Sequence, residues 1–417
     1  MYLRSGLMRL LVAMALFLSS CQNAVDSSRA TWRCAEPMPT RAAETLTSRI
    51  PQVISTREVK IFGGDGVVAI NPCTGYVYVA GSAHLTILRG ADIVTEIPIA
   101  VNDFRKMAVD EANGLLYIAN QDSDNVTVIR GTEQIGVVPT VGKFPRGVAV
   151  ESRSGYAYVV SPYRSRPFGA GSLEGHILVI SGTQVLDNLK LEQVFPGQVV
   201  ADPLSGLIYV GANKKVLVFK DLQETARYEL EVGVDSMDVN PRSGEIYALT
   251  HGTLYRFKDG RLIDSVVLGS AIGNVEQIRV NPVSGAVYVP HSGYVPTEGR
   301  VVVVQNMKVI EDVQVGGRAA LAIDPTTGIV YAANYGGEGP DINTVSVIDG
   351  TKVVATIRVG RNPYKIALNP ANGWVYVSNT NDGTVTILGY PRSKSTVPTL
   401  TGTTPVIPNR PTSATYP

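Results

Sequence analysis

The stretch Asp324-Pro-Thr-Thr-Gly-Ile-Val-Tyr331 decides the fold of this chain, because a version of it occurs eight times. Each copy is a short turn that ends in Gly, followed by one residue, one apolar residue and Tyr. The tyrosines of the other seven copies are Tyr78, Tyr117, Tyr158, Tyr209, Tyr247, Tyr288 and Tyr376. Successive copies lie 38 to 51 residues apart. A period near 40 residues with four short strands per unit is typical of a β-propeller.

Apolar runs on both sides of each copy predict the strands. In the seventh copy these runs are residues 321–323, 330–333, 344–348 and 352–357, all rich in β-branched residues. Pro presets φ for the turn between the first two strands, and Gly accepts the positive φ that closes it. The sequence therefore predicts an all-β propeller of eight four-stranded blades. A seven-bladed ring is the alternative, if one copy is an insertion.

Small residues at one position of the repeat indicate radial packing, because blades converge toward the axis. This position holds Ala69, Ala108, Ala149, Ala322 and Ala367. It breaks the rule in two successive repeats, with Asp238 and Arg279. Buried charges are costly unless they are paired, so a salt bridge near the axis is predicted between these two.

The ring needs a further strand to close. The last repeat ends after its third strand, Val385–Leu388, with no apolar fourth strand behind it. Upstream of the first copy, Arg57–Gly64 looks like the fourth strand and turn at Ala355–Gly360. We therefore predict that an N-terminal strand completes the last blade, within a propeller that spans residues 55–390. Closure removes a sheet edge that would invite aggregation.

The repeats resemble those of the YVTN family of bacterial β-propeller proteins. The resemblance is strongest at Asp324–Asn334, Val345–Gly350 and Ile357–Gly360, and it covers roughly Val59 to Leu388. It implies the propeller fold and a secreted or surface-attached protein, since the family is mostly described in those terms. It implies no particular activity, because the repeats of the family are structural.

The N-terminal residues 1–20 predict a targeting segment. Arg4 and Arg9 precede the apolar run Leu10–Leu18, and Leu18-Ser-Ser-Cys21 resembles the lipobox of bacterial lipoproteins. The resemblance implies cleavage before Cys21, lipidation of its sulfur and, with Gln22 next in the chain, an outer-membrane location in the cell envelope. An ordinary signal peptide or a single membrane anchor is the alternative. Residues 21–54 would form a tether, and the Ser/Thr/Pro-rich residues 391–417 a disordered tail.

Two cysteines remain, Cys34 and Cys73. In an oxidising compartment such a pair usually forms a disulfide, which would pin the tether to the first blade. Two free thiols or an intermolecular bridge are the alternatives. No Cys-x-x-Cys-His sequence is present, so covalent haem is excluded, and no cofactor is expected.

Charge and motifs say little about chemistry. The net charge of +1 provides no general attraction for nucleic acid. Common catalytic motifs are absent from the sequence. His84, His251 and His291 follow the tyrosine strand by a few residues and fall on one face. They could form a three-His metal site, but solvated loop histidines are the favoured interpretation, and no metal is expected.

Aligned repeats place a ring of variable residues at one mouth of the central channel. This ring favours a polar or zwitterionic ligand because cations occupy blades two and three and acids occupy blades five and six. Freely varying solvated residues are the alternative. The ring and the adjoining position hold Gly66, Arg105, Lys106, Arg146, Gly197, Gln198, Asp235, Glu276, Gln277, Ala319, Tyr364 and Lys365, with Lys143 nearby.

Two long loops on the same face complete the predicted binding surface. Ser161–Gly175 combines the aromatic and Arg residues typical of interface hot spots, and His291–Gly299 adds one Tyr. Their candidate residues are Tyr163, Arg164, Arg166, Phe168 and Tyr294. A flexible solvated insertion is the alternative. The sequence favours a lipid-anchored, non-catalytic binding or scaffolding module for a protein or glycan partner. The alternative is an envelope lyase or hydrolase, which would require Arg146, His251, Glu276 and His291 to converge.

Overall fold

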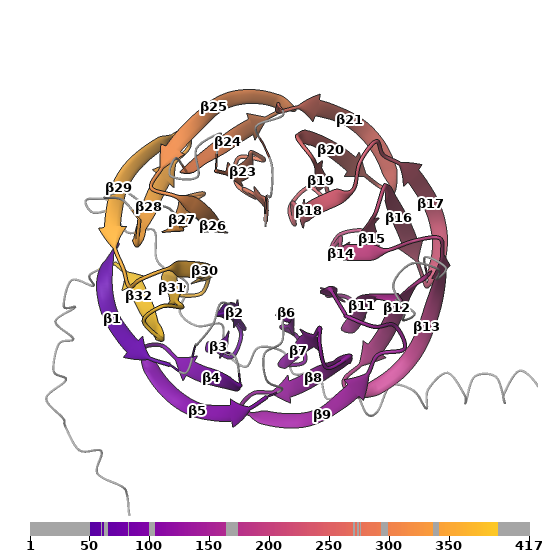
Figure 1. The fold of residues 1–417 in the computed structure, drawn as a ribbon, viewed down its shortest axis with the longest axis horizontal. Coiled ribbons are helices and arrows are strands. Elements are labelled where there is room, and N and C mark those ends of the chain that lie inside the picture. Colours follow the sequence, from indigo (N-terminus) through magenta and orange to yellow (C-terminus); the bar gives the residue numbers. More distant parts are fainter. Residues whose placement is uncertain are drawn as a thin grey trace, which may run out of the picture.

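The computed structural model describes residues 51–59, 61, 66–81, 83–99, 105–163, 174–269, 272, 275, 277–292, 299–336 and 342–390. These residues form 32 β-strands and no helix. The strands make eight four-stranded sheets that stand around a central axis (Figure 1). The fold is an eight-bladed β-propeller, as the sequence predicts, and the seven-bladed alternative is wrong. Within the described part, no helix is long and apolar enough to cross a membrane.

The strands fall into four positions, counted outward from the axis. The innermost strands are β2 (Val67–Ile70), β6 (Arg105–Asp110), β10 (Gly147–Glu151), β14 (Pro196–Ala201), β18 (Val234–Val239), β22 (Arg279–Val280), β26 (Arg318–Ile323) and β30 (Pro363–Asn369). The second strands are β3 (Tyr76–Ala80), β7 (Leu115–Asn120), β11 (Tyr156–Tyr163), β15 (Ile208–Ala212), β19 (Ile246–Thr250), β23 (Val287–His291), β27 (Val330–Tyr335) and β31 (Trp374–Asn379).

The third strands are β4 (His84–Arg89), β8 (Asn125–Arg130), β12 (Glu174–Ser181), β16 (Lys215–Lys220), β20 (Thr253–Lys258), β24 (Gly299–Gln305), β28 (Thr344–Asp349) and β32 (Thr384–Gly389). The outer strands are β5 (Asp92–Pro98), β9 (Glu133–Pro139), β13 (Gln184–Glu192), β17 (Gln223–Glu229), β21 (Arg261–Val267), β25 (Lys308–Val315), β29 (Lys352–Arg358) and β1 (Gln52–Glu58). Blades one to eight follow the order of their inner strands, β2 to β30. The outer strand of blade eight therefore comes from the other end of the chain.

The turn between the first and second strands explains the repeated sequence. In blade one, Asn71 Oδ1 accepts the backbone N–H groups of Cys73 at 2.9 Å and Thr74 at 3.1 Å. Gly75 has φ of 74° and donates its N–H to the carbonyl of Asn71 at 2.8 Å. A side chain would be strained at that φ. The repeat therefore has Gly at the end of the turn and, at its start, Asn or Asp in seven blades and Glu151 in blade three, which accepts the Arg153 and Ser154 N–H groups in the same way.

The core lies between blades and not within them. One hydrophobic cluster joins Tyr158 and Val160 of β11 to Ile208 and Val210 of β15 in the next blade. Second and third strands are buried on both faces, as in β7, where all six residues are buried. This explains why their apolar residues do not alternate with polar ones.

An N-terminal strand closes the ring, but it begins earlier than predicted. Strand β1 pairs with β32 in antiparallel register, from Gln52 opposite Gly389 to Glu58 opposite Thr384. The predicted strand and turn, Arg57–Gly64, overlap only the last two residues of β1. Strand β1 also extends the propeller beyond its predicted start at residue 55. The predicted signal segment, Cys21, Cys34 and the tail 391–417 lie outside the described residues.

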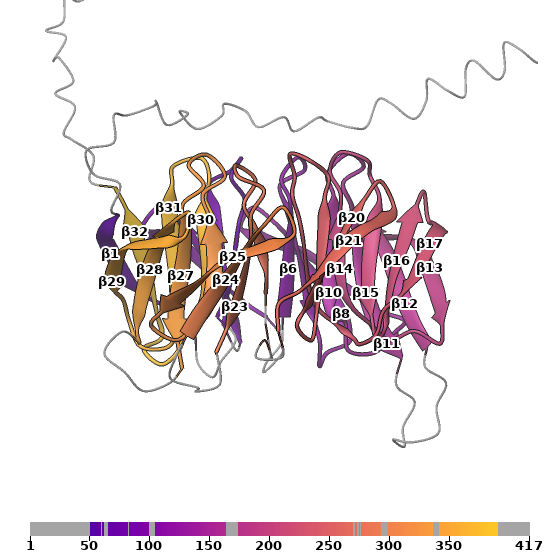
Figure 2. The same cartoon turned by 90° about the horizontal axis from the view of Figure 1, so that it is seen from above.

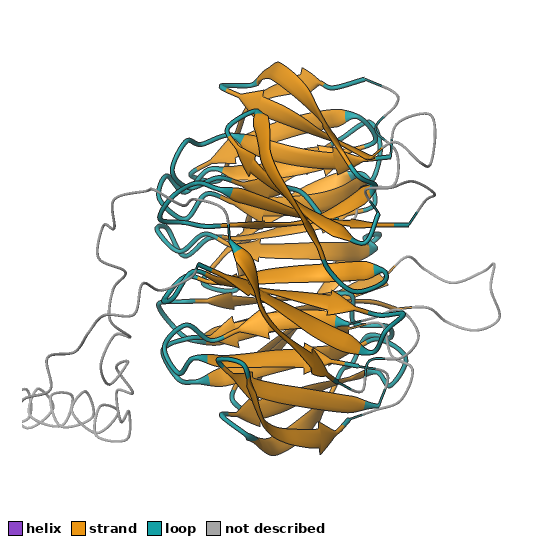
Figure 3. Cartoon of the chain, turned by 90° about the vertical axis from the view of Figure 1, so that its left-hand side faces the viewer, coloured by secondary structure: helices purple, strands orange, loops and turns teal. Residues whose placement is uncertain are grey.

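The propeller has two different faces, seen edge-on in Figures 2 and 3. We call the side with the loops from second to third strands, and from outer to next inner strands, the loop face. The opposite side, with the turns from first to second and from third to outer strands, is the turn face. Strand β32 ends and strand β1 begins at the turn face, where Gly389 pairs with Gln52. Both ends of the propeller therefore leave from the turn face.

Candidate functional site

The predicted mouth residues lie at the loop-face ends of the inner strands. Arg105 is the first residue of β6, opposite Asn120, and its side chain is outside the described residues. Lys106 is exposed beside it. Asp235 belongs to β18 and Tyr364 to β30. Glu276 is outside the described residues.

The cationic side of the mouth is formed by two blades. Arg146, directly before β10, is exposed, and its guanidinium carbon lies 5.3 Å from the centre of the Phe195 ring. This stacking orients the arginine while leaving its charge in water. Lys143 contributes less than predicted, because its Nζ lies 2.8 Å from Asp124 Oδ2. Phe195 was not identified from the sequence.

The acidic side contains Asp235, which is half-buried. Burial raises the pKa of its carboxyl group above the ordinary value, and nearby His251 lowers it in part. Gln198 of blade four donates its side-chain amide to the Asp235 carbonyl at 3.0 Å. Asp235 and His251 therefore lie near enough at the mouth of blade five for the histidine to influence the carboxyl group.

An aromatic corner lies between blades seven and eight. The rings of Tyr364 and Tyr335 meet edge to face with centres 5.1 Å apart. Lys365 Nζ lies 4.2 Å from the centre of the Tyr364 ring. Tyr364 is half-buried, so this corner offers a ring edge and a positive charge to a ligand.

The long-loop candidates are mostly outside the described residues. Tyr163 ends β11 opposite Glu174, and its side chain is not described. Arg164, Arg166, Phe168 and Tyr294 are not described either. Their part in binding therefore stays a prediction.

The histidines occupy different environments. His291 Nε2 lies 3.1 Å from Asp312 Oδ1, and its side chain is only 4% exposed. Arg300 Nε donates to Asp312 Oδ2 at 2.7 Å. His291 thus faces the outer strand of its own blade. Among the described residues, no three His, Cys, Asp or Glu side chains form a group that could hold a metal ion.

The described members of the predicted enzyme constellation do not converge. Arg146 leads into blade three, His251 lies in blade five, and His291 is directed to Asp312 in blade six. His251 instead lies near Asp235, which the sequence grouped with the charged mouth, and lowers the pKa of that carboxyl group in part. Sequence periodicity places residues by blade and height, but not by rotamer.

The central channel widens into a cavity of about 630 Å³ at its turn-face end. Asp238 and Arg279 line it, with Asp238 Oδ1 3.8 Å from Arg279 Nη1. The predicted salt bridge near the axis is therefore present. Asp238 Oδ2 also accepts the Val280 N–H at 2.8 Å, and burial raises the pKa of this carboxyl group despite Arg279.

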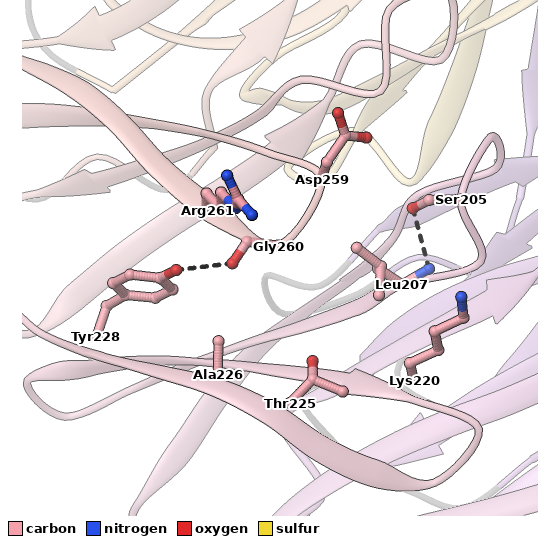
Figure 4. A pocket seen from close by; sticks show the side chains of 9 residues that line it. All are labelled: Ser205, Leu207, Lys220, Thr225, Ala226, Tyr228, Asp259, Gly260 and Arg261. Atoms are coloured by element: carbon pink, nitrogen blue, oxygen red, sulfur yellow. Dashed lines mark hydrogen bonds between the residues drawn. The ribbon is translucent and has the colours of Figure 1, made fainter.

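A second hollow of about 540 Å³ lies between blades four and five near the turn face (Figure 4). Tyr228 donates its hydroxyl to the Gly260 carbonyl at 2.8 Å, and the Gly260 N–H donates to the Tyr209 hydroxyl at 2.8 Å. Lys220, Thr225, Asp259 and Arg261 line its edges. Its floor is therefore formed by contacts between blades.

Comparison with known proteins supports the fold alone. No protein-family model matches the chain, and no curated protein matches it in sequence. Among solved structures, the chain is similar to one titled Kuenenia stuttgartiensis Hydrazine Synthase, with a TM-score of 0.51 and 15% identity. The match covers 67% of this chain and 94% of the other. The class of protein defined by fold and comparison is a β-propeller.

Proposed function

We propose that this chain is a lipid-anchored β-propeller of a bacterial cell envelope that binds a protein or glycan partner without catalysing a reaction. The observation that carries the proposal is the exit of both propeller ends from the turn face. An anchor at Cys21 would then leave the loop face free for a partner. The YVTN-like repeats and the lipobox-like Leu18-Ser-Ser-Cys21 support the same assignment, and Gln22 favours the outer membrane.

The loop face offers chemistry suited to recognition. Arg146 and Lys106 provide cations, Asp235 an acid, and Tyr364 with Lys365 an aromatic corner. Arg and Tyr contribute disproportionately to protein interfaces, and aromatic rings also stack on sugars. The charges lie on inner strands or, for Arg146, directly before one, so a rigid scaffold holds them.

Anchoring and recognition need separate tests. Cys21→Ser should move the protein from the membrane fraction to the soluble fraction, or leave an uncleaved precursor, whereas Cys34→Ser should stay membrane-bound. Normal processing and attachment of Cys21→Ser would refute the anchor. Recognition is tested by capture from envelope extracts, with and without residues 164–173. Equal capture by both forms would place binding elsewhere.

A second candidate function rests on Asp235 and His251. A carboxyl group of raised pKa beside an imidazole is a common acid–base arrangement, so an envelope lyase or hydrolase is the alternative. Asp235→Asn would abolish turnover of envelope glycans or peptides if the enzyme hypothesis holds. Under the binding hypothesis there is no turnover for this substitution to remove.

A further inference from the structure

The turn-face end of the channel departs from the repeat at four residues. The residue two before each turn is Ala or Val in six blades, but Asp238 in blade five and Arg279 in blade six. The second residue of the turn is Pro in six blades, but Glu111 in blade two and Ser152 in blade three. Packing does not require these charges, because the other blades form the same strands without them.

Three of these departures line one cavity. The hollow of about 630 Å³ is walled mainly by Val, Ala, Ile, Leu, Met and Pro from six blades. Its only charged lining residues among those described are Glu111, Asp238 and Arg279. The wall of this hollow exposes polar atoms as well as apolar side chains, and a hollow of this size with a few placed charged groups can hold a small molecule.

Asp238 and Arg279 also have a structural role. Strand β22 has only two residues, and blade five supports it through Asp238, which accepts the Val280 N–H, and Ser236, whose hydroxyl accepts the Ile278 N–H at 3.0 Å. Arg279 Nε donates to the Leu321 carbonyl of blade seven at 3.3 Å. The Arg279 side chain is nonetheless 32% exposed, and its nearest approach to Asp238 is a loose 3.8 Å. A guanidinium with five N–H donors retains capacity for a ligand carboxylate.

Glu111 faces this pair from the other side of the ring. Blades two and six are four apart in a ring of eight, so Glu111 and Arg279 lie on opposite walls of the channel. Partial burial of the carboxyl group, with a smaller effect of Asp110, raises the pKa of Glu111, although the residue as a whole is exposed. No described cation forms an ion pair with Glu111, so an ammonium group placed there would compensate its charge.

We propose that the turn-face end of the channel binds a small zwitterion, with a primary amine at Glu111, a carboxylate at Arg279 and an apolar segment between them. The two carboxylates and one guanidinium of the lining sum to one negative charge, so the amine is the end that the site requires. This site lies on the opposite face from the proposed partner surface and is independent of lipid anchoring.

Calorimetry on the mature chain tests the proposal with straight-chain ω-amino acids, from aminobutanoate to aminooctanoate, and with hexanoate and hexylamine. At least one amino acid should bind about tenfold more tightly than either single-ended probe, a modest value for a charge-assisted contact. Glu111→Gln should weaken binding of the ω-amino acid and of hexylamine but not of hexanoate. Arg279→Gln should weaken binding of the ω-amino acid and of hexanoate but not of hexylamine.

Three further variants separate binding from folding. Glu133→Gln and Arg318→Gln, on blades two and seven, change the same residue types outside the cavity and should bind like the wild type. Ala367→Phe fills the cavity without altering either charge and should abolish binding of every probe, which covers the case in which Arg279→Gln unfolds. No binding of any ω-amino acid by the wild type, or unchanged binding by Ala367→Phe and Glu111→Gln, would overturn the proposal.

Discussion

The hydroxyl of Tyr376 donates a hydrogen bond to the carbonyl of Gly90 at 3.1 Å, across 286 residues of sequence. Tyr376 is the repeat tyrosine of blade eight, and Gly90 is in the outer hairpin of blade one. Tyr78 reaches Gly131 at 3.0 Å in the same way, and Tyr288 reaches Gly350 at 2.9 Å. The repeat tyrosine therefore joins each of these blades to the next, and Tyr376 does so across the closure of the ring.

Tyr376→Phe should lower the free energy of unfolding by about 1 kcal/mol, the usual net value of one buried hydrogen bond. The aromatic ring of residue 376 remains in the core, so only the hydroxyl group and its hydrogen bond to Gly90 are lost. Urea unfolding of the wild type and the variant measures the difference. Tyr158→Phe is the matched control, because no hydrogen bond of the Tyr158 hydroxyl is found among the described residues, although the ring is buried. Equal losses in both variants would show that the bond to Gly90 does not stabilise the ring.

Blade seven shows what replaces this bond at the junction of the chain ends. Blade eight has no hairpin between its third and outer strands, because its outer strand is β1. The hydroxyl of Tyr331 therefore hydrogen-bonds to the hydroxyl of Tyr390, at 2.8 Å, in place of a hairpin glycine.

Deleting Gln52–Glu58 should expose the edge of β32 and cause aggregation or loss of cooperative unfolding. A deletion variant that stays monomeric and melts like the intact protein would contradict the role of β1 in closure.

The sequence predicted closure of the ring by an N-terminal strand but placed that strand too late in the chain. The correct position can be recognised from a bulge that β1 shares with the other outer strands. In β1 the register shifts between Val53 and Ser55, which leaves Ile54 as the extra residue. In β29 the partners skip Val354 in the same way. The pair Val53-Ile54 therefore corresponds to Val353-Val354, and both pairs are exposed. The exposed apolar pair at the start of the outer strand was the signal that would have placed β1, and a match to the glycine turn alone missed it.

The candidate site was less predictable than the fold. Repeat alignment placed Arg146 and Asp235 at the mouth, because the period fixes the blade of each residue and its position along the channel axis. It could not show that Lys143 is paired with Asp124 or that His291 faces Asp312, since these depend on side-chain direction. The Asp238–Arg279 pair was predictable because adjacent blades place the same slot side by side.

A disulfide between Cys34 and Cys73 should be found in the exported protein. Cys73 lies in the first turn of blade one and is not a free thiol in the structure. Closing a loop of about 40 residues would stabilise the fold by roughly 3–4 kcal/mol by the chain-entropy estimate. Mass spectrometry of unreduced peptides should find the two cysteines linked. Two thiols that react fully with an alkylating reagent would refute the pairing.

His176 should make stability fall in mild acid. Burial lowers the pKa of this imidazole below its ordinary value of 6.5, although its hydrogen bond to Asn188 acts in the opposite direction. The unfolded chain therefore takes up the proton first as the pH falls, and the folded state loses stability below about 6.5. His176→Gln should flatten this dependence in unfolding measured from neutral pH to pH about 5. An identical pH dependence in the wild type and His176→Gln would exclude His176 as its source.

Arg146→Glu should weaken partner binding while changing the melting temperature little. The side chain is exposed at the mouth, so its stacking on Phe195 contributes only about 0.5–1 kcal/mol to stability. Reversing the charge, however, removes the cationic side of the mouth and places an acid there. Arg89→Glu is the matched control, because Arg89 also lies over an aromatic ring, that of Tyr76 at 5.9 Å, but on the turn face. Capture of the partner should fall for Arg146→Glu alone. If Arg89→Glu weakens capture and Arg146→Glu does not, the partner binds the turn face, and the assignment of the loop face is wrong.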